Sequence, residues 1–289
     1  MFRIGDVFEQ LAFSGNSLGR DIIGNEKTVT SIKRNDFERY RDTHYYSENI
    51  LVTVAGNVKE HEVLKLVEKY FAELEPKPKA KAKSTEFNSE QKKPRVKLHS
   101  KKKEQAHFIL GFMGQGRGYK GRYEEAVLAA ILGGGMSSRL FTEVRERRGL
   151  AYSIRTSIER YDETGYIGTY AGVDPKRIDE AIKVVLSEHY KLASGVSPIT
   201  SRELSKAKEY LKGHLALSLE DTRNVNHFIA EQELFLRKIE TPEAVYKKID
   251  EVQIGDILHE AKNLFKREKL NLALIGPYQD PIRFEKLIR

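Results

Sequence analysis

Residues 132–153 read LGGGMSSRLFTEVRERRGLAYS. The apolar stretch before them, 123–132, predicts a helix that ends at the three glycines. Ser137 or Ser138 can then cap a second helix, because a serine side chain accepts from the free amide groups of a first helical turn. The residues that follow, 152–161, alternate in polarity and predict a strand. This stretch therefore predicts a helix, a glycine turn, a helix and a strand in direct succession.

The same periodicity predicts elements on both sides of that stretch. Further strands are expected at 49–55, 96–99, 107–112, 165–173 and 270–275. Further helices are expected at 2–12, 36–45, 60–74, 176–193, 200–219, 222–237, 242–251 and 255–265. Strands gather in one part of the chain and helices in another, without strict alternation. This order predicts an α+β fold in which a mainly antiparallel sheet is flanked by helices, with the helices on one face.

The N-terminal part of the chain resembles its C-terminal end at an offset of 220 residues. Val52 then falls on Leu272 and Gly56 on Gly276, and both copies combine an acidic helix start, an amphipathic helix and an apolar strand stopped by glycine. The repeat predicts two homologous domains, of which one is partial and one complete. We expect the missing part of the first domain to lie upstream of Met1.

This repeat suggests three parts of the chain. Residues 1–75 are predicted to be the C-terminal remnant of the first domain, and 94–289 the complete second domain. Between them, 76–93 is rich in lysine and proline and predicts an extended linker.

The formal net charge of +8 is concentrated near that linker. Residues 76–103 hold 11 lysines and arginines against Glu86 and Glu90, while the rest of the chain has 39 basic and 40 acidic residues. No aromatic side chains alternate with these lysines to stack on bases, so binding of nucleic acid is not expected.

Targeting signals and cysteines are absent from the sequence. The longest apolar run, 126–132, is far too short to cross a bilayer, and the first residues lack the pattern of a signal peptide. The sequence has no cysteine, which excludes disulfides and thiolate ligands. We expect a cytoplasmic protein without membrane association.

Metal ligands with the usual spacing are also absent. No two of the eight histidines lie three to five residues apart, so no helical turn presents a histidine pair to zinc. His61 and His259 each precede a glutamate, but Lys65 and Asn263 stand where a second histidine would be needed. The sequence predicts no metal site in this chain.

Nucleophilic and phosphate-binding motifs are missing as well. The chain has no G-x-S-x-G, and the glycines at 133–135 lack the spacing of a P-loop and follow a helix instead of a strand. We interpret these glycines as a flexible break between two helices.

The stretches 132–141 (LGGGMSSRLF) and 144–153 (VRERRGLAYS) resemble the second domain of insulinase/pitrilysin-type zinc metallopeptidases, which include mitochondrial processing peptidases and their bacterial relatives. Residues 15–24 (GNSLGRDIIG), 45–46 (YY) and 52–57 (VTVAGN) resemble the closing part of that family's first domain. The resemblance covers nearly the whole chain.

The resemblance implies a pair of homologous domains that close around an unfolded peptide. In the family, the first domain binds zinc through H-x-x-E-H and a further glutamate, and these would lie upstream of Met1. The second domain supplies an arginine and a tyrosine seven residues apart that bind substrate near the scissile bond, and these correspond to Arg145 and Tyr152. Taken alone, the two residues would be interpreted as a surface arginine and a tyrosine at a strand end.

We therefore expect a portion of a zinc-dependent endopeptidase that binds a peptide or unfolded protein. It would carry no catalytic residue and no cofactor of its own, and would work as a homo- or hetero-oligomer with a chain that supplies H-x-x-E-H. The alternative is an inactive structural or peptide-binding homologue, or a truncated gene product.

Overall fold

The computed structural model describes residues 2–74, 87 and 91–289, which form two compact units. The sheet unit comprises residues 2–20, 87–215 and 241–289. The helical unit comprises the described residues of 21–86 together with 216–240.

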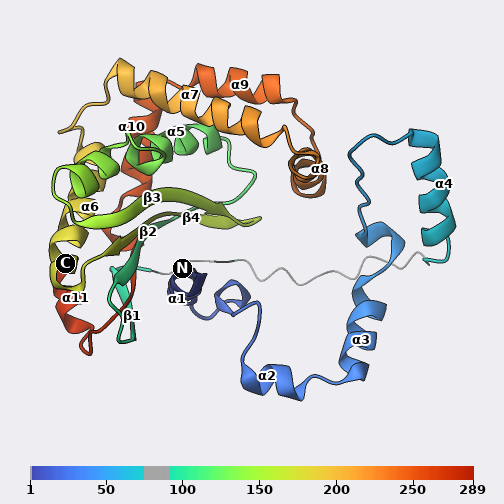
Figure 1. Ribbon diagram of the computed structural model, residues 1–289, viewed down its shortest axis with the longest axis horizontal. Coiled ribbons are helices and arrows are strands. Elements are labelled where there is room, and N and C mark those ends of the chain that lie inside the picture. The colour runs from blue at the N-terminus through green and yellow to red at the C-terminus, as the bar shows by residue number, and fades with distance from the viewer. Residues whose placement is uncertain (1, 75–86, 88–90) are drawn as a thin grey trace. The chain divides into compact units, whose positions relative to one another are not determined.

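A five-stranded sheet forms the centre of the sheet unit (Figure 1), with the strand order β1-β5-β2-β4-β3. Only the β1–β5 pair is parallel, and the other three pairs are antiparallel. The predicted α+β class with a mainly antiparallel sheet is thereby confirmed. The strands are β1 (Arg95–Ser100), β2 (Ala106–Gln115), β3 (Ala151–Arg160), β4 (Thr164–Val173) and β5 (Leu270–Gly276).

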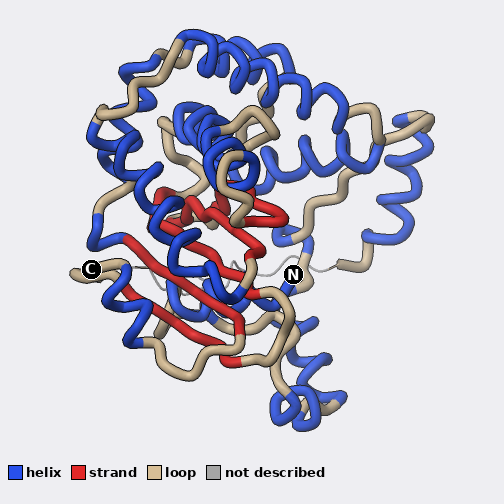
Figure 2. The backbone as a smooth tube through the Cα atoms, turned by 60° about the vertical axis from the view of Figure 1, so that its left-hand side comes forward, coloured by secondary structure: helices blue, strands red, loops and turns tan. Residues whose placement is uncertain are grey.

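Helices pack on one face of this sheet and enclose the main core. Phe108 and Phe112 of β2 point to that face and are fully buried beside apolar side chains of the covering helices, such as Leu128 and Ile182. The helices that contribute to this core are α5 (Arg122–Gly133), α6 (Ile178–Ser194), α7 (Ser201–Ser218, which belongs to this unit up to residue 215), α9 (Pro242–Glu251), α10 (Ile254–Leu264) and α11 (Ile282–Leu287). Figure 2 shows the strands of this sheet side by side, with helices packed against them.

The first helix, α1 (Phe2–Ala12), covers part of the opposite face, which differs from the expectation that helices lie on one face only. Phe8 and Phe13 are fully buried against Tyr166 of β4. Gly111 of β2 makes room for this packing, since a Cβ atom there would lie 2.5 Å from the Phe8 ring. The carboxylate of Glu9 accepts a hydrogen bond from the Tyr166 hydroxyl at 3.1 Å. Burial of these aromatic rings holds α1 to the sheet.

The predicted linker, 76–93, lies mostly outside the described residues. Its described end is attached to the sheet unit: Phe87 packs edge-on against Phe13, with ring centroids 5.1 Å apart. The Gln91 side chain is buried and donates to the carbonyl of Leu270 at 2.8 Å.

The helical unit contains α2 (Glu26–Ser31), α3 (Arg34–His44), α4 (Glu60–Phe71) and α8 (Thr222–Glu231). The strand predicted at 49–55 is wrong, because residues 50–58 have no regular structure and pair with no described strand. Instead, Asn226 of α8 donates to the carbonyl of Thr53 at 3.2 Å. Helix α2 was not predicted, although Asn25 and Thr28 form a reciprocal capping box at its start.

Apolar side chains of the helical unit remain exposed. None of the residues described in α2, α3, α4 and α8 is buried, and Phe37 and Tyr70 are 67% and 71% exposed. Ile22 and Ile23 are also exposed. These apolar side chains are therefore accessible to another part of the protein or to a partner.

Candidate functional site

A π-helical segment, Phe141–Glu146, leads from the glycine stretch toward β3. Two backbone bonds close its end: the Leu150 amide donates to the Val144 carbonyl at 2.8 Å, and the Gly149 amide donates to the Arg145 carbonyl at 3.2 Å. Gly149 has a φ of 57°, a left-handed conformation that glycine adopts with little strain. The turn at Gly149 thus connects the backbone of Arg145 to the start of β3. π-Helical turns are frequent at functional sites.

Arg145 is exposed, and its guanidinium group lies over the Phe141 ring, 4.9 Å from the ring centroid. Its side chain makes no hydrogen bond or ion pair with any other described residue. The ring orients the guanidinium group, while its planar set of N–H donors stays available to a ligand.

Tyr152 lies at a β-bulge. Ala151 pairs with Val173 and Ser153 pairs with Gly172, so Tyr152 is an extra residue in β3 without a partner on β4. A bulge changes the direction of a side chain relative to a regular strand. The Tyr152 side chain is 63% exposed, and its hydroxyl has no hydrogen bond with another described residue. The structure therefore places two unused donor groups on either side of the Gly149 turn.

The glycines before this segment serve close packing, which differs from the flexible break that we expected. Gly133 belongs to α5 and lies against Thr156 of β3. A Cβ atom at Gly133 would lie 2.4 Å from the Thr156 hydroxyl and 2.5 Å from its backbone nitrogen. Only glycine allows α5 to approach the sheet this closely.

A chain of buried polar groups begins beneath Gly133. The Thr156 and Thr169 hydroxyls lie 2.8 Å apart, and Thr169 lies 3.2 Å from Nε2 of His189. Nδ1 of His189 lies 2.8 Å from the Val185 carbonyl. Because a carbonyl only accepts, Nδ1 carries the proton and Nε2 accepts from Thr169. Burial lowers the pKa of His189 to about 4, although the bond to Val185 opposes this shift.

Arg139 connects the glycine stretch to the loop between α6 and α7. Its side chain is 10% exposed and donates to both carboxylate oxygens of Glu203, at 2.7 and 3.2 Å. It also donates to the carbonyls of Ser197 and Pro198, at 3.0 and 2.9 Å. The sequence gives no signal for this arrangement beyond the arginine itself, since its partners lie about sixty residues away.

The described residues do not fit a metal. They contain no group of three or more histidine, aspartate or glutamate side chains that could hold an ion, and the full sequence contains no H-x-x-E-H. The proposed role of this chain therefore includes no step at a metal of its own. In the part of the chain that the structure describes, no helix has the length and apolar composition needed to cross a bilayer.

The chain is similar to known proteins in sequence and in fold. An uncharacterized zinc protease of Bacillus subtilis is 34% identical over 276 residues, which cover 95% of this chain and 65% of that relative. The fold is similar to that of a protease from Helicobacter pylori, with a TM-score of 0.85 at 20% identity, over 96% of this chain and 69% of the other. It is similar also to a peptidase M16 inactive domain from Pseudomonas fluorescens, with a TM-score of 0.83 at 18% identity, over 95% of this chain and 65% of the other.

The chain thus spans somewhat less than two thirds of the Bacillus subtilis relative's length. Residues 31–211 match the family described as "Peptidase M16 inactive domain". This match confirms the resemblance that the glycine-to-tyrosine stretch indicated. The chain belongs to the M16 family of zinc peptidases and contains that family's inactive domain.

Proposed function

We propose that this chain is the substrate-holding, non-catalytic portion of a zinc-dependent endopeptidase. Arg145 and Tyr152 would bind the peptide, and a partner that carries H-x-x-E-H would supply the metal. The observation that supports this most is that both side chains have their donors unused by other described residues, on either side of one glycine turn.

The two side chains suit the backbone of an extended peptide. A guanidinium group offers several N–H donors in a plane, and a phenol offers one O–H donor. Both can donate to peptide carbonyl oxygens and fix the position of the peptide. Donors held in place before the reaction also stabilise negative charge that develops on a carbonyl oxygen. In this proposal, Arg145 and Tyr152 bind and polarise the substrate but do not activate water.

The exposure of apolar side chains in the helical unit supports the proposal that this chain has a partner. Ile22, Ile23, Phe37 and Tyr70 would be covered by the portion of the peptidase that precedes the stretch matched here. We infer that residues 1–75 belong to the closing part of a first domain and that 94–289 form the second. In the sheet unit, residues 2–20 pack with this second part.

Peptide binding by the purified chain tests the role of the two residues. We expect a fluorescent unstructured peptide to bind saturably in a polarisation measurement. Tyr152→Phe should weaken binding about 3- to 10-fold, which corresponds to the loss of one hydrogen bond. Arg145→Ala should weaken it at least as much. The melting temperature should change by less than about 2 °C, because the Tyr152 hydroxyl bonds to no described residue and the Arg145 contact with the Phe141 ring lies at the surface.

Tyr246→Phe and Arg223→Ala are matched controls, since they remove the same groups from sites outside the turn. Both should bind like the unmodified chain. Equal binding by Tyr152→Phe, Arg145→Ala and the controls would refute the assignment. A large loss of stability in the two site variants would show that these residues are structural.

A further inference from the structure

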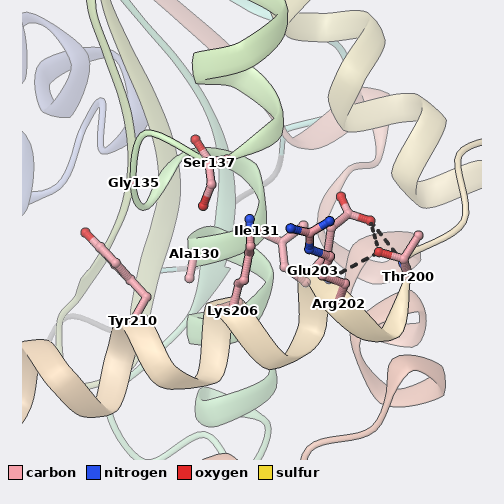
Figure 3. A pocket seen from close by; sticks show the side chains of 11 residues that line it. Ala130, Ile131, Gly135, Ser137, Thr200, Arg202, Glu203, Lys206 and Tyr210 are labelled. Atoms are coloured by element: carbon pink, nitrogen blue, oxygen red, sulfur yellow. Dashed lines mark hydrogen bonds between the residues drawn. The ribbon is translucent and has the colours of Figure 1, made fainter.

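A cavity of about 260 Å³ lies between the glycine stretch and the first half of α7. Figure 3 shows Lys206 extending from α7 toward Ser137 of the glycine stretch, with Tyr210 one turn further along the helix. Ser138 and Arg202 also line the cavity. Arg145 and Tyr152 do not line it, so it is separate from the proposed peptide site.

The cavity has an excess of positive charge. Arg202 and Lys206 are four residues apart on α7 and therefore lie on the same side of the helix. Neither forms an ion pair with a described residue. The carboxylate that lines the cavity, Glu203, is already neutralised by Arg139. Burial alone would raise the pKa of Glu203. The hydrogen bonds from Arg139 and Thr200 outweigh burial and hold this pKa below its ordinary value.

One of the residues that line the cavity, Ser138, carries a buried hydroxyl group without a partner among the described residues. Ser138 is 5% exposed, and its Oγ makes no hydrogen bond with any described residue. Buried polar groups are nearly always satisfied, so an unpaired one indicates a missing ligand or water. Its neighbour Ser137 and the Tyr210 phenol add two further hydroxyl groups to the cavity wall.

We propose that this cavity binds a phosphate dianion, held by Arg202, Lys206 and the hydroxyl groups of Ser137 and Ser138. A carboxylate carries a single negative charge and would neutralise only one of the two positive charges of Arg202 and Lys206. A phosphate group carries a charge of about −1.5 to −2 at pH 7 and offers several acceptor oxygens. It therefore matches both the two cations and the hydroxyl donors. The phosphate can be inorganic or belong to a small phosphate monoester.

Calorimetric titration of the full chain at constant ionic strength tests this proposal. The probes are inorganic phosphate, glycerol phosphate and, as a monoanion, acetate. We expect saturable binding of at least one phosphate probe and none of acetate. Binding should tighten several-fold between pH 5 and pH 7.5, as the phosphate gains its second charge. Tighter binding of inorganic phosphate would identify the free anion, and tighter binding of glycerol phosphate would identify a monoester.

Substitutions locate the binding. Lys206→Gln and Ser138→Ala should each weaken phosphate binding at least fivefold, whereas Lys262→Gln, which removes a charge from an exposed position on α10, should not. Ser138→Ala removes only an unpaired hydroxyl group and should leave the fold intact. Tyr152→Phe should not change phosphate binding, which separates this proposal from the peptide site. Absence of saturable phosphate binding, equal binding of acetate, or an equal loss in Lys262→Gln would overturn the proposal.

Discussion

Replacing Arg139 with alanine should lower the free energy of unfolding by about 3 kcal/mol or more. The side chain is nearly buried and donates to Glu203, Ser197 and Pro198. Its removal leaves the Glu203 carboxylate with only its bonds from Thr200 and takes this donor from two carbonyl groups. Breaking a buried ion pair from one side costs about 3–5 kcal/mol, and this partly buried pair lies near the lower end of that range. Arg139→Lys should recover only part of this loss, because an ammonium group cannot reproduce the planar set of donors. Urea unfolding measures both effects.

Arg147→Ala is the matched control for this measurement. Arg147 is 66% exposed and pairs with Glu143 on the surface of the same segment. Exposed pairs contribute at most about 1 kcal/mol, so this variant should unfold nearly like the unmodified chain. If Arg139→Ala were as stable as Arg147→Ala, the connection between the glycine stretch and α7 would not contribute to the fold.

Acid should destabilise the sheet unit through His189. The folded pKa of His189 is about 4, against an ordinary value of 6.5. A lowered pKa means that the folded state favours the neutral ring, so this contribution is fully present above pH 6.5. It is lost as the pH falls from 6.5 through 4. The difference of about 2.5 pKa units corresponds to about 3 kcal/mol. Protonation would also make Nε2 a donor, so the Thr169 hydroxyl would have to accept this bond and turn its own proton toward Thr156.

His189→Phe isolates this effect. The variant should be less stable at pH 7, because the Thr169 hydroxyl loses its acceptor, but it has no ring to protonate. Unfolding by urea at pH values from 7 to 3 should therefore show a smaller loss for His189→Phe than for the unmodified chain, by about 3 kcal/mol. Parallel losses in the two proteins would show that His189 is not the group responsible.

Most elements of the sheet unit could be predicted from the sequence, because each has a clear periodicity and recognisable ends. Helix α9, for example, has the predicted bounds, with Thr241 as its cap and Pro242 in its first turn. The apolar stretch at 49–55 shows the limit of this reasoning. Its composition suits a strand, but a strand needs a neighbour to pair its backbone groups, and no described strand lies beside it.

The candidate site was only partly accessible from the sequence. The resemblance pointed to Arg145 and Tyr152, but the bulge at Tyr152 depends on how β3 pairs with β4. Arg139 and Glu203 are 64 residues apart, and no local pattern connects them. The cavity beside α7 likewise depends on packing between distant helices. Interactions of this kind follow from tertiary structure.

The most direct test of the proposed function is the hydrolysis of an unstructured fluorogenic peptide. It would be measured with the purified chain alone and with the chain co-expressed with the part of the Bacillus subtilis relative that precedes the matched stretch. The two together should cleave the peptide in a chelator-sensitive reaction. Tyr152→Phe and Arg145→Ala should lower kcat/KM by about 1–3 kcal/mol of transition-state stabilisation. Peptide binding without cleavage by the pair would favour the inactive, peptide-binding alternative.

For the chain alone, we predict no chelator-sensitive hydrolysis and no stoichiometric zinc, because no histidine pair has ligand spacing. About one zinc per chain, together with chelator-sensitive cleavage by the chain alone, would contradict the proposed function.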